Sequence, residues 1–154
     1  MASGSLDWTR FVNISGQDAA ELIARAYKGA TLRATHTGPA EASTGHTIIE
    51  ITNRGIILGG FIWLNPTNSQ ISDYMWVLID GNLVGNLSFY MANILRIFER
   101  NQDILYLISY DDIDHWYCMS ITPMLTFETS FKIIYWEESG NTPSINATLF
   151  YALI

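Results

Sequence analysis

Apolar residues recur along this chain in short segments, separated by turn-forming residues, from position 31 to the end. Segments that follow one another at intervals of roughly ten residues are typical of a β-sandwich or barrel and not of βαβ units. The stretch 92–100 fits a helical turn as well as a strand. The pattern predicts about eight or nine strands, at residues 31–37, 46–52, 55–64, 72–80, 83–91, 103–110, 114–121, 129–137 and 145–153.

Two predicted turns carry clear local signals. Asn53-Arg54-Gly55 joins two apolar segments, and Gly55 suits a position with positive φ. Asp80-Gly81-Asn82 follows an apolar strand, and Asp-Gly is among the strongest short hairpin signals. Strand 129–137 alternates well, because Phe131, Ile133 and Tyr135 fall on one face of it.

The segment before the strands has helical periodicity. Apolar residues recur at helical spacing from Ala19 to Tyr27, and Ser15 with Asp18 imitates a capping box. This predicts a helix over 17–28, whose apolar stripe would cover an edge of the sheets or pack on a neighbouring subunit. Since no linker divides the chain, we expect a single domain over residues 1–154, with an N-terminal arm and helix at 1–30 and a β-sandwich at 31–154.

The last predicted strand is apolar on both faces. One face carries Leu149 and Tyr151, and the other carries Phe150 and Ile154. An antiparallel strand with one face in water should alternate apolar and polar residues. We therefore predict that this strand is covered on both sides, and that these four residues contribute to self-association.

Composition supports self-association. Of the 154 residues, 49% are hydrophobic and only 15% are charged, against roughly 25% in an ordinary soluble domain. Apolar surface that charge cannot cover usually marks a protein interface. The net charge is −7 and no basic cluster occurs, which disfavours binding to nucleic acid or to an anionic membrane surface.

Targeting signals and the cysteine content give limited information on localisation. The longest apolar stretch, Gly55 to Leu64, is roughly half of a membrane-spanning helix, so no membrane insertion is expected. No signal peptide is recognisable at the N-terminus, and the localisation stays open, with a virion or extracellular particle favoured. Cys118 is the only cysteine and has apolar neighbours, which predicts a buried, inert thiol and excludes an intrachain disulfide.

The densest polar cluster offers the main candidate site. Its carboxylates and histidine could hold a hard cation such as Ca²⁺, and its tryptophan could stack on a sugar ring of a glycan. The alternative is an exposed acidic hairpin between strands 103–110 and 114–121. The candidate ligand-binding residues are Asp111, Asp112, Asp114, His115 and Trp116.

Catalysis has little support in the sequence. No nucleophile elbow, P-loop or zinc-ligand spacing occurs, so we predict no catalytic residues, no metal and no cofactor. Carboxylates such as Glu50, Asp80, Glu99 and Asp103 could serve a glycoside hydrolase, but any acidic domain contains such residues. Tryptophans could also form a platform for carbohydrate. Trp63 and Trp76, however, lie on neighbouring predicted strands of one hairpin, which favours core packing.

Three stretches carry a family resemblance. They run from Thr47 to Trp63 with its Gly59-Gly60 pair, from Trp76 to the Ile-Asp-Gly sequence ending at Gly81, and from Thr126 to Ile134. With them, about two thirds of the chain resembles single jelly-roll proteins of viral particles and phage fibre heads, and the jelly-roll halves of fructan-processing glycoside hydrolases. No catalytic motif of those hydrolases can be matched. The resemblance implies trimers or larger rings.

These observations together predict an all-β protein, an antiparallel jelly-roll β-sandwich with one short N-terminal helix. Its expected function is that of a non-enzymatic structural protein that self-assembles, as a virion or surface-filament component whose partner is itself. One alternative is a carbohydrate-binding module or receptor-binding fibre head that recognises a surface glycan. A second alternative is a small oligomeric glycoside hydrolase.

Overall fold

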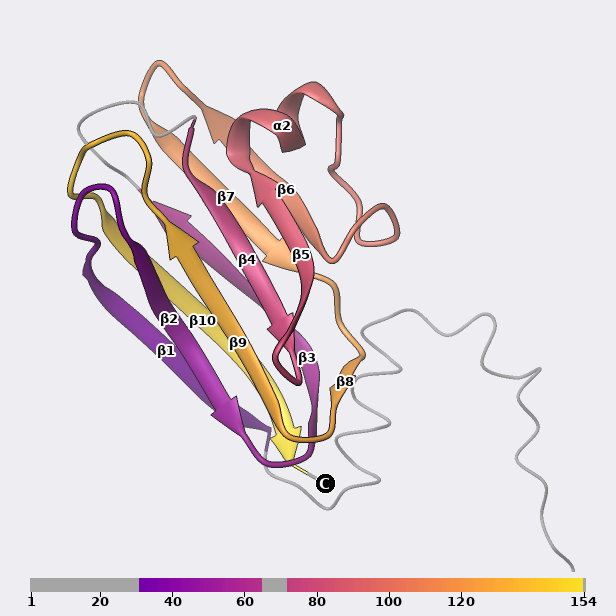
Figure 1. Ribbon diagram of the computed structural model, residues 1–154. Helices are drawn as coiled ribbons and strands as arrows, with labels where there is room; N and C mark the ends of the chain where they lie inside the picture. Colours follow the sequence, from indigo (N-terminus) through magenta and orange to yellow (C-terminus); the bar gives the residue numbers. More distant parts are fainter. Residues whose placement is uncertain (1–30, 65–71, 154) are drawn as a thin grey trace, which may run out of the picture.

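The computed structural model describes residues 31–64 and 72–153, and in these residues strands dominate (Figure 1). The predicted helix at 17–28 lies outside the described residues. The elements are β1 (Leu32–Pro39), β2 (Gly45–Thr52), β3 (Gly55–Leu64), β4 (Tyr74–Ile79), β5 (Asn82–Ser88), α2 (Phe89–Ile94), β6 (Leu105–Asp111), β7 (Trp116–Ile121), β8 (Leu125–Phe127), β9 (Ser130–Trp136) and β10 (Ser144–Leu153).

The strands form two antiparallel sheets, which confirms the predicted all-β sandwich. One sheet has the order β1-β10-β3-β7-β6, and β8 also pairs with β3. The other has the order β2-β9-β4-β5. The two sheets lie face to face, and α2 lies at one end beside β5 and β6 (Figure 1).

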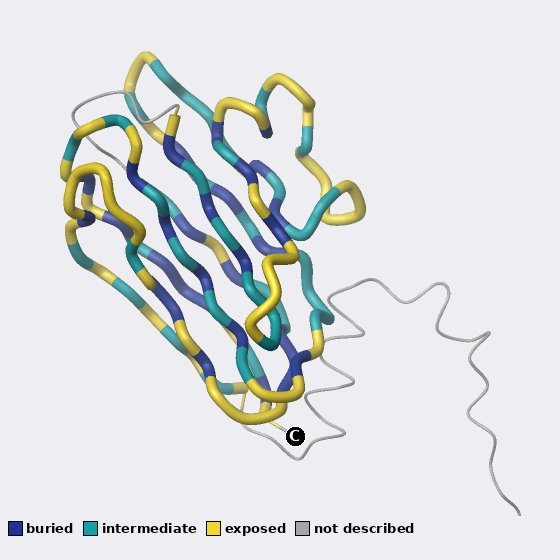
Figure 2. Tube along the Cα trace, viewed as in Figure 1, coloured by how far each residue is buried: buried dark blue, intermediate teal, exposed yellow. Residues whose placement is uncertain are grey.

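The core lies between the sheets. Buried positions alternate with partly exposed ones along most strands, and the exposed residues gather in the loops (Figure 2). In β9 the side chains of Phe131, Ile133 and Tyr135 share one face, as predicted, and this face is buried, while Lys132, Ile134 and Trp136 are not buried. The largest fully buried side chains come from both sheets and α2: Tyr117, Tyr135, Phe89, Phe127 and Phe131.

The two predicted turns have different outcomes. Asp80-Gly81 joins β4 and β5 as a hairpin, with φ values of 52° and 80° at the two residues. Asn53-Arg54 instead joins β2 to β3, which lie in different sheets, and the positive φ (79°) falls on Asn53. Gly55 is needed for space, because a Cβ there would lie 2.5 Å from the Phe127 ring.

Three local predictions need correction. Ser88 caps a helix that begins at Phe89, so the predicted strand 83–91 ends early and the ambiguous stretch starts in α2. The short strand β8 was not predicted. In β10 the two faces do not alternate regularly, because Thr148 is buried between Ala147 and Leu149, and Ala152 is buried while Leu153 is exposed.

Candidate functional site

The acidic cluster forms the turn between β6 and β7. Asp111 Oδ1 accepts hydrogen bonds from the backbone N–H groups of Ile113 and Asp114, at 2.9 and 3.0 Å. These hydrogen bonds hold the pKa of the Asp111 carboxyl below its usual range, and the one from the Asp114 N–H has the largest effect. The carboxylate therefore closes its own turn, as an Asx turn does. The described residues form a hairpin here between β6 and β7.

Asp112 and His115 also have contacts within the hairpin. Asp112 Oδ1 accepts a hydrogen bond from the Tyr117 hydroxyl and lies 4.0 Å from His115 Nδ1. Trp116 is exposed, as is the Asp114 position. Within residues 31–64 and 72–153, no group of three or more His, Cys, Asp or Glu side chains is arranged to hold a metal ion.

The four residues predicted for self-association are separated by the structure. Leu149 is buried in the core, and Tyr151 packs against the core while half-buried. Phe150 is 37% exposed on the outer face of the six-stranded sheet and lines a cavity there together with Phe61. Ile154 lies outside the described residues. Of the three described residues, Phe150 is the one that offers surface to a partner.

Three aromatic side chains on the outer face of the four-stranded sheet contact one another pairwise, an arrangement that the sequence did not reveal. We call Tyr74, Trp76 and Trp136 the aromatic row. The Trp76 and Trp136 rings are stacked with centroids 5.0 Å apart, and the Tyr74 and Trp136 rings are stacked at 6.3 Å. The ring of Trp136 lies over Gly45, where a Cβ would approach it to 2.5 Å. A glycine on β2 is thus required for this arrangement.

The row corrects the expectation that Trp63 and Trp76 belong to one hairpin. Trp63 lies on β3 in the other sheet, where it contacts Phe61 at 5.3 Å between ring centroids. Both tryptophans are half-buried on outer faces and do not belong to the core. Cys118 also points outward and is half-buried, and burial raises the pKa of its thiol to about 11.

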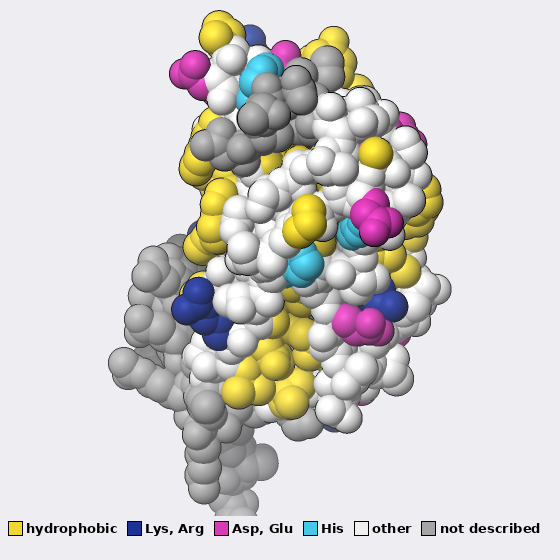
Figure 3. All heavy atoms as spheres, turned by 90° about the vertical axis from the view of Figure 1, so that its left-hand side faces the viewer, with side chains coloured by type: hydrophobic (Ala, Val, Ile, Leu, Met, Phe, Trp, Pro, Cys, Tyr) yellow, Lys and Arg dark blue, Asp and Glu magenta, His cyan; other side chains and the backbone are white. Residues whose placement is uncertain are grey.

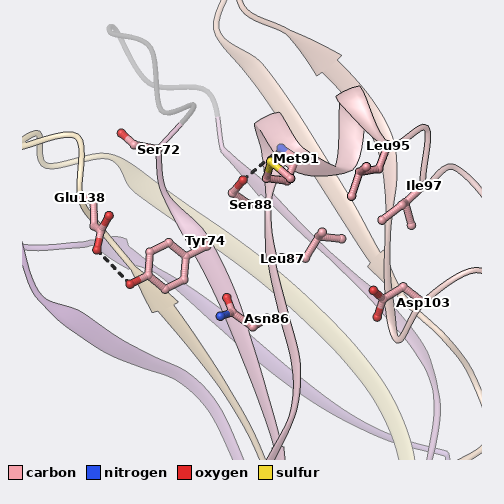
Figure 4. A pocket seen from close by; sticks show the side chains of 10 residues that line it. All are labelled: Ser72, Tyr74, Asn86, Leu87, Ser88, Met91, Leu95, Ile97, Asp103 and Glu138. Carbon is pink, nitrogen blue, oxygen red and sulfur yellow. Dashed lines mark hydrogen bonds between the residues drawn. The ribbon is translucent and has the colours of Figure 1, made fainter.

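A cavity of about 460 Å³ adjoins the aromatic row between Tyr74 and α2 (Figure 4). Asn86 and Leu87 of β5 form its floor, and Met91, Leu95 and Ile97 form an apolar wall opposite Tyr74. Its polar lining consists of Ser72, Ser88, Asn86, Asp103 and Glu138. The two carboxylates lie at opposite sides of the cavity, and the Tyr74 hydroxyl donates to Glu138 Oε1 at 2.9 Å (Figure 4).

A buried carboxylate fixes the loop that carries Glu138. Asp73 accepts hydrogen bonds from the backbone N–H groups of Glu138 and Ser139, both at 2.9 Å, and from the Tyr135 hydroxyl. Desolvation raises the pKa of Asp73 against the opposing effect of these hydrogen bonds. Glu137 is buried as well, and accepts from the N–H groups of Ser43 and Asn141. Residues 72–74 and 137–139 therefore hold one another in place beside the cavity.

A patch of exposed apolar side chains lies on α2 and the residues that follow it. We call this patch the α2 surface; its side chains are each between 44% and 57% exposed. The helix buries only Phe89 and Ala92, and it has no acidic residue in its first turn and no basic residue in its last. The α2 surface consists of Tyr90, Met91, Ile94, Leu95 and Phe98.

Among the described residues, no helix has the length and apolar character needed to cross a membrane. The sequence matches no known protein-family model, and no curated protein is significantly similar to it.

Proposed function

We propose that this protein is a non-enzymatic structural component that assembles with further copies of itself, as a virion or surface-filament subunit does. The observation that carries the proposal is the α2 surface. Five large apolar side chains are presented to water by one short segment, without a charged residue in the helix. Exposed apolar side chains gathered in one segment usually mark an interface.

The position of the α2 surface favours association of copies. The helix follows directly from β5, the edge strand of the four-stranded sheet. The free side of an edge strand presents unpaired backbone groups that another strand can bind. At the far end of β5, Leu83 is 50% exposed, so apolar side chains flank this edge at both ends. A second copy could cover the helix and the edge together.

The distribution of charge agrees with this proposal. On the side of the molecule where β1 and β2 form the edges of the sheets, charged side chains are few and separated, and apolar side chains reach the surface between them (Figure 3). A copy that meets this face, which lies on the other side of the molecule from α2 (Figure 1), would bury few unpaired charges, and unpaired buried charges are the main electrostatic cost of an interface.

The strand order supports a jelly roll, the architecture expected from the sequence. In the chain, β1 to β4 alternate between the sheets, and β9 and β10 return between the earlier strands of each. A jelly roll consists of eight strands in two sheets with such Greek-key connections. We assign the eight strands β1-β10-β3-β7 and β2-β9-β4-β5 to it, with β6 and β8 as additions. Together with the resemblance to viral jelly-roll proteins, this order favours a particle subunit.

Native mass tests the proposal. Light scattering of the purified full chain should give a mass that is a multiple of 17.4 kDa. The double change Ile94→Lys and Leu95→Lys places two charges in the interface and should shift the protein toward the monomer. Ile113→Lys is the matched control, because Ile113 is exposed in the β6–β7 turn and is not part of the α2 surface. A wild-type protein that stays monomeric at all concentrations overturns the proposal. Oligomers that persist in the double variant reject the α2 surface as the interface.

A further inference from the structure

We propose that the cavity beside Tyr74, together with the aromatic row, binds a neutral oligosaccharide. This site is separate from the acidic turn at 111–116, and it shares Met91 and Leu95 with the α2 surface.

The aromatic row provides the apolar half of such a site. The Tyr74 and Trp136 rings are nearly parallel, with 12° between their planes, and Trp76 stacks on Trp136 at 29°. The three rings lie on an outer sheet face and are half-buried, so part of each remains open to solvent. A pyranose ring carries C–H groups on its faces, and these pack against aromatic rings that have polar groups nearby.

The cavity provides the polar half. Asn86, on β5, offers an amide that can donate to and accept from hydroxyl groups, and its position lies directly opposite Trp76 in the β4–β5 ladder. Glu138 and Asp103 offer carboxylate acceptors on opposite sides of the cavity (Figure 4). Hydrogen-bond acceptors and one amide, next to apolar walls, are the groups that a hydroxyl-rich ligand requires.

The sign of the charges selects the class of glycan. The charged groups that line the cavity are Glu138 and Asp103, and the described lining contains no lysine or arginine. An anionic sugar would place its carboxylate or sulfate against these groups without a compensating cation. The ligand is therefore a neutral oligosaccharide, not a sialylated or sulfated one.

The site is preorganised by contacts between two loops. Ser72, Asp73 and Tyr74 are consecutive, and each contacts residue 138 or 139. The Ser72 and Ser139 hydroxyls are 3.1 Å apart, and Asp73 holds the backbone of Glu138. Groups that are fixed before a ligand arrives lose little entropy on binding, which favours affinity.

The test uses a printed array of neutral and anionic glycans with the labelled full-length protein. Binding should be confined to neutral oligosaccharides. A neutral glycan that binds is then titrated by calorimetry. Trp136→Ala and Asn86→Ala should each weaken its affinity at least tenfold, because they remove a stacking ring and the amide.

Trp63→Ala is the matched control, because Trp63 belongs to an aromatic pair on the outer face of the other sheet. It should leave the affinity unchanged. If no neutral glycan binds, or if the Trp136 and Asn86 variants bind as tightly as the wild type, the proposal is overturned. Met91 and Leu95 belong to both the cavity and the α2 surface, so neither is changed here. The native mass of the Trp136 variant shows separately whether assembly is intact.

Discussion

Carboxylates gather in two regions of this protein, and the two groups are held in opposite ways. In the β6–β7 turn, Asp111 accepts from N–H groups only two and three residues further along the chain. At the end of β4, Asp73 accepts from Tyr135, Glu138 and Ser139, which are more than sixty residues away. The first group is dense in the sequence and exposed. The second is scattered in the sequence and buried.

The difference shows that a local cluster of acidic residues can indicate a turn and not a binding site. Successive carboxylates repel one another and find their partners in the backbone next to them, which is turn chemistry. A single carboxylate at the end of an apolar strand, such as Asp73 before β4, is buried when sheet pairing brings another loop to it. Asp73, which is isolated in the sequence, therefore positions the cavity wall, although the dense cluster at 111–116 is the more conspicuous candidate in the sequence.

The largest expected effect comes from removing the buried carboxylate. Asp73→Ala leaves two backbone N–H groups and two hydroxyls without this acceptor, and the hydrogen bond of the Tyr135 hydroxyl among them is buried. Unsatisfied buried donors cost about 1–3 kcal/mol, and we expect the free energy of unfolding to fall by about 3 kcal/mol. Urea denaturation measures it. Asp73→Asn keeps one acceptor oxygen and should fall between the wild type and Asp73→Ala. If Asp73→Ala lowers the free energy of unfolding no more than Asp111→Ala does, the proposed difference between the two groups of carboxylates is wrong.

Most of the sandwich could be predicted because most strands have a local signal in the sequence. β9 alternates between core and surface residues, and the Asp80-Gly81 pair fixes the β4–β5 hairpin. The short strand β8 escaped prediction because its three residues are too few to show a period. The turn at Asn53 and the hairpin at Asp80-Gly81 have similar sequence signals, although the first joins two sheets. Turn residues show where a chain reverses but not whether it changes sheets.

The candidate site at the cavity could not be predicted for a related reason. Trp76 and Trp136 stack only because β4 pairs with β9, and Tyr74 lies directly opposite Trp136 in that ladder. Such pairings join residues far apart in the chain, and alternation within one strand does not identify the neighbouring strand. An outward aromatic residue also looks like a core residue when the opposite face of its strand is apolar too, as at Trp76 between Met75 and Val77.

Asp80 shares features with both groups of carboxylates. Its contribution to stability is expected to be smaller than that of Asp73 and to depend on pH. It accepts from the backbone N–H groups of Glu128, Thr129 and Ser130, which lower its pKa to about 2 from an ordinary value of 3.8. Since the folded pKa is the lower one, the ionised carboxylate stabilises the fold above about pH 4, and this contribution disappears as the pH falls through about 2. Like Asp73 it holds a distant segment, but it is open to solvent.

Asp80→Asn should therefore lower the melting temperature by a constant amount between neutral pH and about pH 4, and by less as the pH falls toward about 2. Thermal unfolding followed by circular dichroism, measured in parallel for both proteins, gives the difference at each pH. Because the Asn82 side chain also contacts the Asp80 backbone, Asn82→Ala serves as a turn variant without a carboxylate change. A difference that widens on acidification would contradict the assignment of these hydrogen bonds.

The smallest effect is expected at Asp111. An asparagine side chain has the same acceptor oxygen for the N–H groups of Ile113 and Asp114, so Asp111→Asn should keep the turn and change the melting temperature least of the variants considered. Asp111→Ala removes the acceptor, but water can reach these exposed N–H groups, so the loss should stay well below that of Asp73→Ala. The rival explanation for the cluster is a cation site, which predicts that Ca²⁺ raises the melting temperature of the wild type and not of Asp111→Asn. Equal melting temperatures with Ca²⁺ and with a chelator leave the turn as the reason for these carboxylates, whereas a Ca²⁺ shift confined to the wild type would show that local density had marked a binding site after all.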